Sequence, residues 1–220
     1  LPHAPRKTIE SFIFLTAATT GLAQPRVAEL GLFAVHRRAL EDHSMDPNPE
    51  LRLSPRIADK LALCVDPQKP FHPKAEALTG LSNRSLGENR KPVFDQALVQ
   101  VVQGFLARQA GPTCLVAHNG YKYDFPLLRT ELDQVGADLP PGTRCLDTLP
   151  ALRELEGAGQ GSYKLRTLYK RYYGREPAGA HSAEGDTLAL LMVFLAKAPE
   201  LMEWAKHNAR SWGEVRPMSL

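Results

Sequence analysis

The sequence predicts an α/β fold in which a mixed five-stranded sheet is flanked by helices. Three observations support this prediction. Three short apolar segments follow one another near the start, strand-like and helix-like segments then alternate, and helices fill the remainder. The length of 220 residues suits one domain, and 43% hydrophobic residues are enough for a substantial core.

The first three predicted strands form an antiparallel meander. Residues 12–15, Phe-Ile-Phe-Leu, are a short apolar run typical of a buried strand, and a turn at Gly21 follows. Residues 27–36 and 60–65 predict the second and third strands, and we expect the third at an edge of the sheet. Residues 37–57 are polar, contain three prolines and show no periodicity, so we expect a loop there.

The rest of the chain alternates and then becomes helical. Residues 94–109 give the clearest amphipathic pattern, with apolar residues on one face and glutamines on the other. Apolar runs predict buried strands at 113–117 and 144–146, and the glycine-rich residues 156–162 predict a flexible loop. Further helices are predicted over residues 75–81, 125–135, 148–155, 164–173, 183–195 and 199–211.

Charge and cysteine usage limit the classes of function. A net charge of +3 permits a polyanionic partner, but it fits an ordinary solvated surface equally well. Cys64, Cys114 and Cys145 lie in or beside apolar runs, and their odd number without paired spacing argues against a disulfide framework or a zinc site. We therefore expect free thiols in a reducing, intracellular compartment.

Targeting and membrane signals are weak in this sequence. No run reaches the roughly 18 apolar residues of a membrane span, so we expect no membrane segment. The first ten residues lack the apolar core of a signal peptide. The sequence begins with Leu1 instead of Met, which is compatible with a piece of a longer protein.

The first candidate site lies after the strand at 113–117. His118 ends this strand, Asn119 and Gly120 form a turn, and Asp124 precedes the helix at 125–135. Side chains at the carboxyl ends of central strands often build sites in α/β sheets. The alternative is structural, with Asn119-Gly120 as a plain turn and Asp124 as a helix N-cap.

The second candidate site is the segment His-Ser-Ala-Glu-Gly-Asp, which opens the helix at 183–195. Ser182 is a plausible N-cap, and His181 and Asp186 are close enough to face one pocket. Alternatively, Asp186 only complements the helix dipole and His181 is a solvated loop residue. Thr16 and Ala18, two apart on the first strand, point to one face, but on residue type alone nothing marks them as functional.

Together these segments resemble one family. SFIFLTAATTGL from Ser11, LTGL at 78–81, LVAHNGYKYDFPLL at 115–128, CLDTLPAL at 145–152 and HSAEGD at 181–186 have the order and spacing of the three-prime repair exonucleases (TREX). These are DnaQ-like enzymes of the DEDDh group with a ribonuclease-H-like fold. The resemblance implies a single exonuclease domain over 1–220, with its core at about 11–218.

The resemblance implies a chemistry and also a defect in it. The family removes 3′-terminal nucleotides from DNA with two Mg²⁺ ions, for which Mn²⁺ is a possible substitute. The resemblance implies that Asp124 and Asp186 bind the metal ions and that His181 is the general base. The family carries an aspartate and a glutamate where this chain has Thr16 and Ala18, so two metal ligands are lost. We expect hydrolysis to be absent or severely impaired.

The resemblance also implies contacts with single-stranded DNA 3′ ends. Leu22 and Leu78 would be apolar wedges beside the terminal bases, with simple core packing as the alternative. The backbone at Ala18 and Thr19 would hold the terminal sugar. Further contacts with the phosphate backbone are implied for Lys122, Tyr123 and Arg153. The basic and aromatic residues at 163–175 could bind nucleic acid, although their spacing favours packing.

Family members form homodimers through an edge strand, for which residues 60–65 are the candidate here. The resemblance is compatible with a location in the cytoplasm or the nucleus. Three functions remain open. One is an exonuclease inactivated by substitution that still binds DNA ends. The second is a natural pseudo-exonuclease that serves as a nucleic-acid-binding or interaction module. The third is a nuclease of the same fold that acts on RNA.

Overall fold

A computed structural model describes residues 8–44, 54–157, 159, 161–179 and 181–218. Within these residues, a mixed sheet of six strands runs through the molecule, in the order β3-β2-β1-β4-β5-β6. The strands are β1 (Ser11–Thr19), β2 (Val27–His36), β3 (Asp59–Cys64), β4 (Thr113–Ala117), β5 (Arg144–Asp147) and β6 (Arg210–Ser211). The α/β prediction is confirmed, as is the place of the third strand at an edge.

Strand direction decides where side chains can meet. β1 pairs with β2 antiparallel, and β2 pairs with β3 in the same way, which confirms the predicted meander. β1 and β4 are parallel, as are β4 and β5. The carboxyl ends of β1, β4 and β5 therefore lie at one edge of the sheet, where α/β proteins build sites. The predicted strand count of five was wrong, because the two-residue β6 adds an antiparallel partner to β5.

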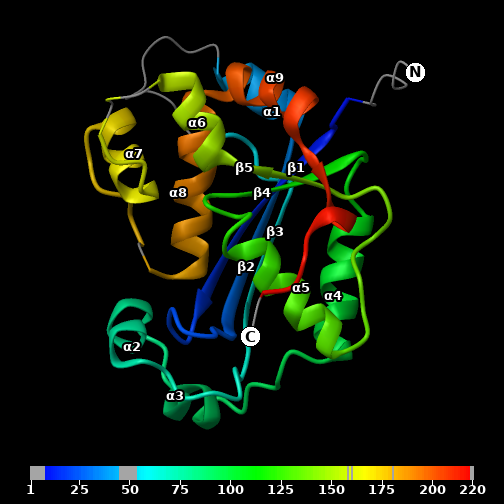
Figure 1. Ribbon diagram of the computed structural model, residues 1–220, viewed down its shortest axis with the longest axis vertical. Coiled ribbons are helices and arrows are strands. Elements are labelled where there is room, and N and C mark those ends of the chain that lie inside the picture. Colours follow the sequence, from blue (N-terminus) through cyan, green and yellow to red (C-terminus); the bar gives the residue numbers. More distant parts are fainter. Residues whose placement is uncertain (1–7, 45–53, 158, 160, 180, 219–220) are drawn as a thin grey trace.

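Helices cover both faces of the sheet, and further helices lie at both of its ends (Figure 1). α6, α7 and α8 lie on one side, and α4 and α5 lie on the other. The helices are α1 (Arg37–Ser44), α2 (Pro73–Thr79), α3 (Asn83–Glu88), α4 (Gln96–Ala107), α5 (Asp124–Gln134), α6 (Thr148–Glu156), α7 (Leu165–Tyr173), α8 (Ala183–Ala196) and α9 (Ala198–Asn208). None of these described helices is long and apolar enough to cross a membrane.

Alternating strand residues divide the core into two layers. Phe12 and Phe14 of β1 pack toward α8, whereas Ile13 and Leu15 pack toward α4 and α5. This is the two-residue period of a strand that is covered on both faces. α8 is almost wholly buried. It approaches β2 so closely that a Cβ on Gly31 would lie 2.5 Å from Oγ1 of Thr187.

Three local predictions needed correction. Residues 37–44 of the expected loop form α1, because Leu40 is buried and the Arg37 guanidinium bonds to Glu10 at 3.0 Å. Residues 45–53 lie outside the described part. α3 escaped prediction because it has only six residues, yet Ser82 and Ser85 form a capping box at its start. The helix expected over 199–211 ends at Asn208, where the chain turns extended.

Two other expectations are met. Cys64, Cys114 and Cys145 are free thiols, and the latter two are buried. In α7, Leu168, Tyr169 and Tyr173 are buried in the core, as packing requires. The α7 bases Arg166 and Arg171 form ion pairs with acidic side chains. The packing interpretation of residues 163–175 therefore explains this segment.

Candidate active site

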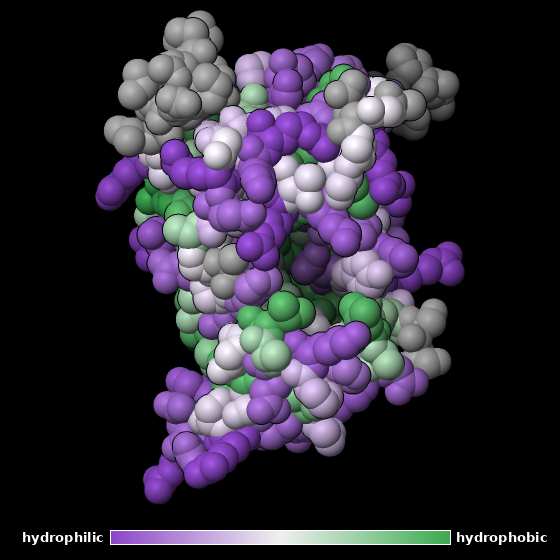
Figure 2. Space-filling model, turned by 90° about the vertical axis from the view of Figure 1, so that its left-hand side faces the viewer, coloured by the Kyte–Doolittle hydropathy of each residue, from purple (hydrophilic) through white to green (hydrophobic). Residues whose placement is uncertain are grey.

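A cavity of about 550 Å³ opens at the carboxyl end of β1. The end of β1 and the turn after it form one wall, α2 forms a second, and the start of α8 forms the third. Figure 2 shows a hollow in this side of the molecule, with hydrophobic side chains gathered along its lower edge. The cavity is lined by Ala17, Ala18, Thr19, Gly21, Leu22, Ala23, His72, Lys74, Ala75, Leu78, Thr79, His181 and Asp186.

The turn after β1 is fixed by a glycine and by α2. Gly21 has a φ of +153°, and a Cβ there would lie 3.1 Å from Cβ of His72. The His72 amide donates to the Thr20 carbonyl at 2.7 Å, and the His72 ring accepts from the Lys74 amide as the N-cap of α2. This turn and α2 therefore form one unit at the mouth of the cavity.

The apolar mouth is solvent-exposed. Leu22 is 89% exposed and Leu78 is 57% exposed, although both are large hydrophobic residues. Core packing, the alternative left open for these two residues, is therefore wrong. Exposed apolar side chains beside a cavity are typical of a surface that binds a ligand.

Thr16 and Ala18 differ in what they do. The Thr16 hydroxyl lies 2.7 Å from Oγ1 of Thr187 and donates to the Ala183 carbonyl at 3.1 Å. These bonds join β1 to α8, and Thr16 is not among the residues that line the cavity. Ala18 does line it, but it offers only a methyl group.

His181 and Asp186 are brought together as predicted. The Asp186 carboxylate accepts the His181 backbone amide at 2.9 Å. His181 has a φ of +77°, a left-handed conformation that a non-glycine residue adopts only when its surroundings hold it. Burial, reinforced by the Glu29 carboxylate, raises the pKa of Asp186, and the contact with His181 opposes this shift. Ser182 caps α8 by accepting the Gly185 amide, as predicted.

Asp124 lies behind the end of β1 and is not among the residues that line the cavity. It is the first helical residue of α5, and Tyr123 occupies the N-cap position, so the N-cap alternative for Asp124 is wrong. Burial raises the pKa of Asp124 to about 7. The Asp147 carboxylate adds to this shift, and backbone amides, including that of Ala17, oppose it. The bond to Ala17 ties Asp124 to β1, directly beside Ala18.

Glu29 was missed by sequence reasoning. It lies on β2 opposite Ala18, and its carboxylate accepts the Ala183 amide at the start of α8 at 2.7 Å. Its other oxygen accepts from the Cys64 thiol at 3.5 Å. Glu29 therefore positions the helix end that carries Asp186. The available signal was a lone acid inside an otherwise apolar strand, since carboxylates are rarely buried without a partner.

The other predicted residues are distributed around the site. Thr19 lines the cavity, whereas Lys122, Tyr123 and Arg153 do not. Lys122 and Tyr123 lie on the exposed turn before α5, with the Lys122 ammonium 5.3 Å from the Tyr123 ring centroid. Arg153 projects from α6, and its guanidinium lies 5.9 Å from the Tyr163 ring centroid.

His118 has a structural role. Its Nδ1 lies 2.8 Å from the Thr148 hydroxyl, and its Nε2 lies 2.6 Å from the Tyr163 carbonyl. A neutral ring protonated at Nε2 satisfies both contacts. Burial lowers the pKa of His118, so the neutral form predominates at pH 7. His118 fixes the loop before α7 to the end of β4.

The residues present do not fit a centre for two divalent cations. Hard cations such as Mg²⁺ prefer several carboxylate oxygens. Among the described residues, no group of three or more His, Cys, Asp or Glu side chains could hold a metal ion. The Thr16 hydroxyl is engaged with α8, and Ala18 carries no donor. Asp124 and Asp186 are the acids that remain of the predicted set.

Comparisons with known proteins give a consistent result. No model of a known protein family matches the chain. The mouse protein Three prime repair exonuclease 2 is 52% identical over 219 residues, which cover 95% of this chain and 92% of the mouse protein. The bovine protein Three-prime repair exonuclease 1 is 43% identical over 230 aligned residues, which cover 99% of this chain and 72% of the bovine protein.

Solved structures share the fold at low identity. A 3′-exonuclease that recognises the histone mRNA stem-loop aligns with a TM-score of 0.66 at 11% identity, over 89% of this chain and 84% of that one. Exonuclease I of E. coli in complex with a dA16 oligonucleotide aligns with a TM-score of 0.65 at 17% identity. The alignment covers 89% of this chain and 42% of exonuclease I. These likenesses support the expected ribonuclease-H-like, DnaQ-type architecture.

Proposed function

The chain belongs to the three prime repair exonuclease family, and from this we propose that it binds 3′ ends of DNA in the cavity beside β1 without hydrolysing them efficiently. In this proposal the family's binding surface is kept, whereas its metal-dependent cutting step is lost. The chain would then hold or protect a DNA end, or present it to another protein.

One observation carries the proposal. The cavity keeps an exposed apolar mouth at Leu22 and Leu78 and a polar wall at His181 and Asp186. The family resemblance puts metal-binding acids at positions 16 and 18, but here the Thr16 hydroxyl is hydrogen-bonded into α8 and Ala18 is a methyl group. The mouth and the wall that would hold a DNA end are therefore present, whereas two of the four metal-binding acids that the resemblance implies are absent.

The cavity suits the end of a single strand. A volume of about 550 Å³ lies within the usual range for a small-molecule site, and a terminal nucleotide is of that class. Bases can stack on Leu22 and Leu78, and Lys74 supplies a cation for a phosphate. Such contacts read the sugar-phosphate chain and base faces, so we expect little sequence preference. The choice of DNA over RNA is part of the proposal and rests on the family.

The expected loss of hydrolysis follows from the small number of carboxylates that remain to bind metal ions. A two-metal centre stabilises both the attacking and the leaving oxygen, and it needs carboxylates that bridge the ions. With Asp124 and Asp186 as the remaining acids, we expect neither Mg²⁺ nor Mn²⁺ to assemble such a centre. His181, the base implied by the resemblance, would then line the cavity without activating water.

The decisive experiment measures binding and cutting in one preparation. A 12-nucleotide DNA strand with a 5′ fluorescent label and a free 3′ end is incubated with the protein and 5 mM MgCl₂ or MnCl₂, and anisotropy and product length are both followed. We expect binding without shortening. The matched variant carries Thr16→Asp together with Ala18→Glu, and degradation by this variant supports an inactivated exonuclease. Degradation by the wild type at the rate of the variant would refute the proposal.

The same variant separates the rival functions. A folded double variant that binds DNA but stays inert supports a natural pseudo-exonuclease, in which further positions have changed. An RNA strand of equal length tests the third possibility. Tighter binding of RNA than of DNA, with 3′ shortening, would support an RNA nuclease.

We also propose that two copies pair through β3. This strand lies at the edge of the sheet and pairs within the described chain with β2 alone. Leu61 and Leu63 lie on it and are only partly buried. An unpaired edge of this kind is normally covered. Sedimentation of the wild type and of Leu63→Lys tests this, with a dimer expected for the first and a monomer for the second.

A further inference from the structure

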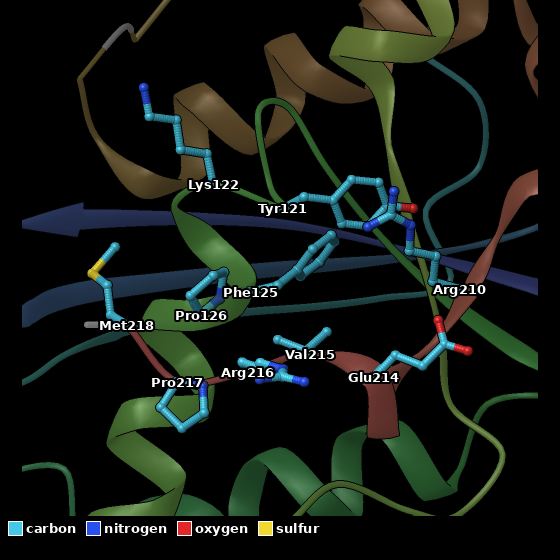
Figure 3. A pocket seen from close by; sticks show the side chains of 10 residues that line it. All are labelled: Tyr121, Lys122, Phe125, Pro126, Arg210, Glu214, Val215, Arg216, Pro217 and Met218. Atoms are coloured by element: carbon cyan, nitrogen blue, oxygen red, sulfur yellow. The ribbon is translucent and has the colours of Figure 1, made fainter.

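A second cavity, of about 340 Å³, lies between the start of α5 and the C-terminal segment at residues 210–218. In Figure 3, Tyr121, Phe125 and Pro126 form one side, and Glu214 to Met218 run along the other. Arg210 lies against Tyr121, and Lys122 extends outward at the margin. None of residues 210–218 lines the cavity at β1.

The cavity has a preformed wall. The C-terminal segment is attached to the body of the protein at both ends. The buried Trp212 donates from Nε1 to the Asp138 carboxylate at 2.7 Å, and its carbonyl accepts from Arg129 of α5 at 2.7 Å. At the other end, the Met218 amide donates to the Thr130 hydroxyl at 2.9 Å. Residues 213–217 are thus held across the face of α5.

The lining is cationic and aromatic. The Arg210 guanidinium lies 4.1 Å from the Tyr121 ring centroid, a stacked cation–π geometry. Arg210, Arg216 and Lys122 line the cavity together with a single acid, Glu214. Within the described chain, none of these three bases forms an ion pair, although arginines on α7 do. Three free cations beside an aromatic face are the chemistry that binds the phosphodiester backbone of nucleic acids.

Its position connects it with the proposed binding site. The turn that contributes Tyr121 and Lys122 continues through Tyr123 directly into Asp124, which is bonded to the end of β1. We propose that this cavity binds a phosphodiester of the nucleic acid whose 3′ end occupies the cavity at β1. The inference rests on the proposed function. Two sources of the phosphodiester are compatible with this chemistry, an upstream part of the same strand and the opposite strand of a duplex.

The test compares three DNA ligands by fluorescence anisotropy in EDTA between 50 and 200 mM salt. A 4-nucleotide strand fills the end site, a 12-nucleotide strand extends beyond it, and a duplex with a 4-nucleotide 3′ overhang adds the opposite strand. The variants are Arg216→Gln and Arg210→Gln. Arg38→Gln is the matched control, because Arg38 is an exposed base on α1 at the opposite end of the sheet. Thermal unfolding checks that each variant is folded.

Loss of one phosphate contact should lower the salt slope by about 0.7 for a single strand or about 0.9 for a duplex. At 50 mM salt this corresponds to about eightfold weaker binding of a single strand. We expect this loss for the 12-nucleotide strand or the duplex, whichever supplies the phosphate, and unchanged binding of the 4-nucleotide strand. Arg38→Gln should match the wild type.

The two proposals fail in different ways. If the wild type binds all three ligands and both arginine variants behave like Arg38→Gln, the second cavity is not a phosphodiester site, but the end-binding function stands. If the wild type binds none of the ligands, the proposed function itself is refuted, and the inference is refuted with it.

Discussion

The hydrogen bonds of Thr16 allow the proposed loss of the metal site to be tested through stability instead of activity. The Thr16 and Thr187 hydroxyls supply two protons to a cluster that also contains the Ala183 carbonyl. In Thr16→Asp, the Thr187 hydroxyl is the one side-chain donor of this cluster that remains, and it can donate to the carboxylate or to the Ala183 carbonyl but not to both. The half-buried charge then lies beside a carbonyl oxygen without a donor between them.

The expected cost follows from that count. Each lost hydrogen bond costs about 1 kcal/mol, and an uncompensated polar group adds about 1–3 kcal/mol. We therefore expect Thr16→Asp in EDTA to lower the free energy of unfolding by about 2–4 kcal/mol. For a chain of this size, 1 kcal/mol shifts Tm by about 2–4 °C, so the decrease should be roughly 4–16 °C. Thr16→Val, which removes the hydroxyl without adding charge, should cost about 1 kcal/mol.

Divalent cations should reverse the effect only when the acids are present. A ligand at 100 times its Kd stabilises the native state by about 2.7 kcal/mol. Mg²⁺ should therefore raise the Tm of Thr16→Asp/Ala18→Glu by about 5–11 °C and leave the wild type unchanged. The assay is thermal unfolding by circular dichroism, with EDTA and with 10 mM MgCl₂. An equal Mg²⁺-dependent rise in the wild type would refute the reasoning, because Asp124 and Asp186 would then suffice.

Three further predictions concern separate parts of the molecule. Leu22→Ala should weaken binding of a 4-nucleotide DNA strand by about 5- to 30-fold and leave the free energy of unfolding unchanged, because the side chain is 89% exposed; Leu155→Ala, an exposed leucine on α6, is the control in an anisotropy titration. Burial lowers the pKa of His118, so the unfolded chain takes up the proton at a higher pH than the folded chain does. The free energy of unfolding should therefore fall as the pH drops below about 6.5. Urea unfolding at pH 7.5 and 5.0 measures this loss, which should be smaller in His118→Gln. Trp212→Ala should lower the free energy of unfolding by about 3–5 kcal/mol, since the ring is buried and packs edge-on against Phe125; a decrease below 1 kcal/mol in urea unfolding would mean that the C-terminal segment is not held as described.

Much of the architecture could be predicted because it is encoded locally. The apolar runs at 12–15, 113–117 and 144–146 give buried strands, since a strand that is covered on both faces consists almost entirely of apolar residues. α1 could not be found this way. It depends on the pairing of Arg37 with Glu10 and on the burial of one leucine, and neither leaves a periodic signal. β6 has two residues and exists because β5 presents an open edge to it.

The candidate site likewise contains one contact that local spacing predicts and others that join distant parts of the sequence. His181 and Asp186 could be paired from the sequence, because five residues at the start of a helix keep them within reach of one another. The contact of Glu29 with Ala183 spans 154 residues, and that of Thr16 with Thr187 spans 171. Such contacts depend on how closely α8 packs against the sheet, which no local spacing specifies.

The order and spacing of residue types are therefore enough to recognise the family, the fold class and the absence of acids at positions 16 and 18. The tertiary structure decided what takes their place. It turns the Thr16 hydroxyl into α8, leaves Leu22 and Leu78 exposed at the mouth of the cavity, and places Arg210 and Arg216 beside the turn that leads to Asp124. The physical reason is that residue types fix which groups exist, whereas packing between distant segments fixes which of those groups are satisfied and which remain free to bind.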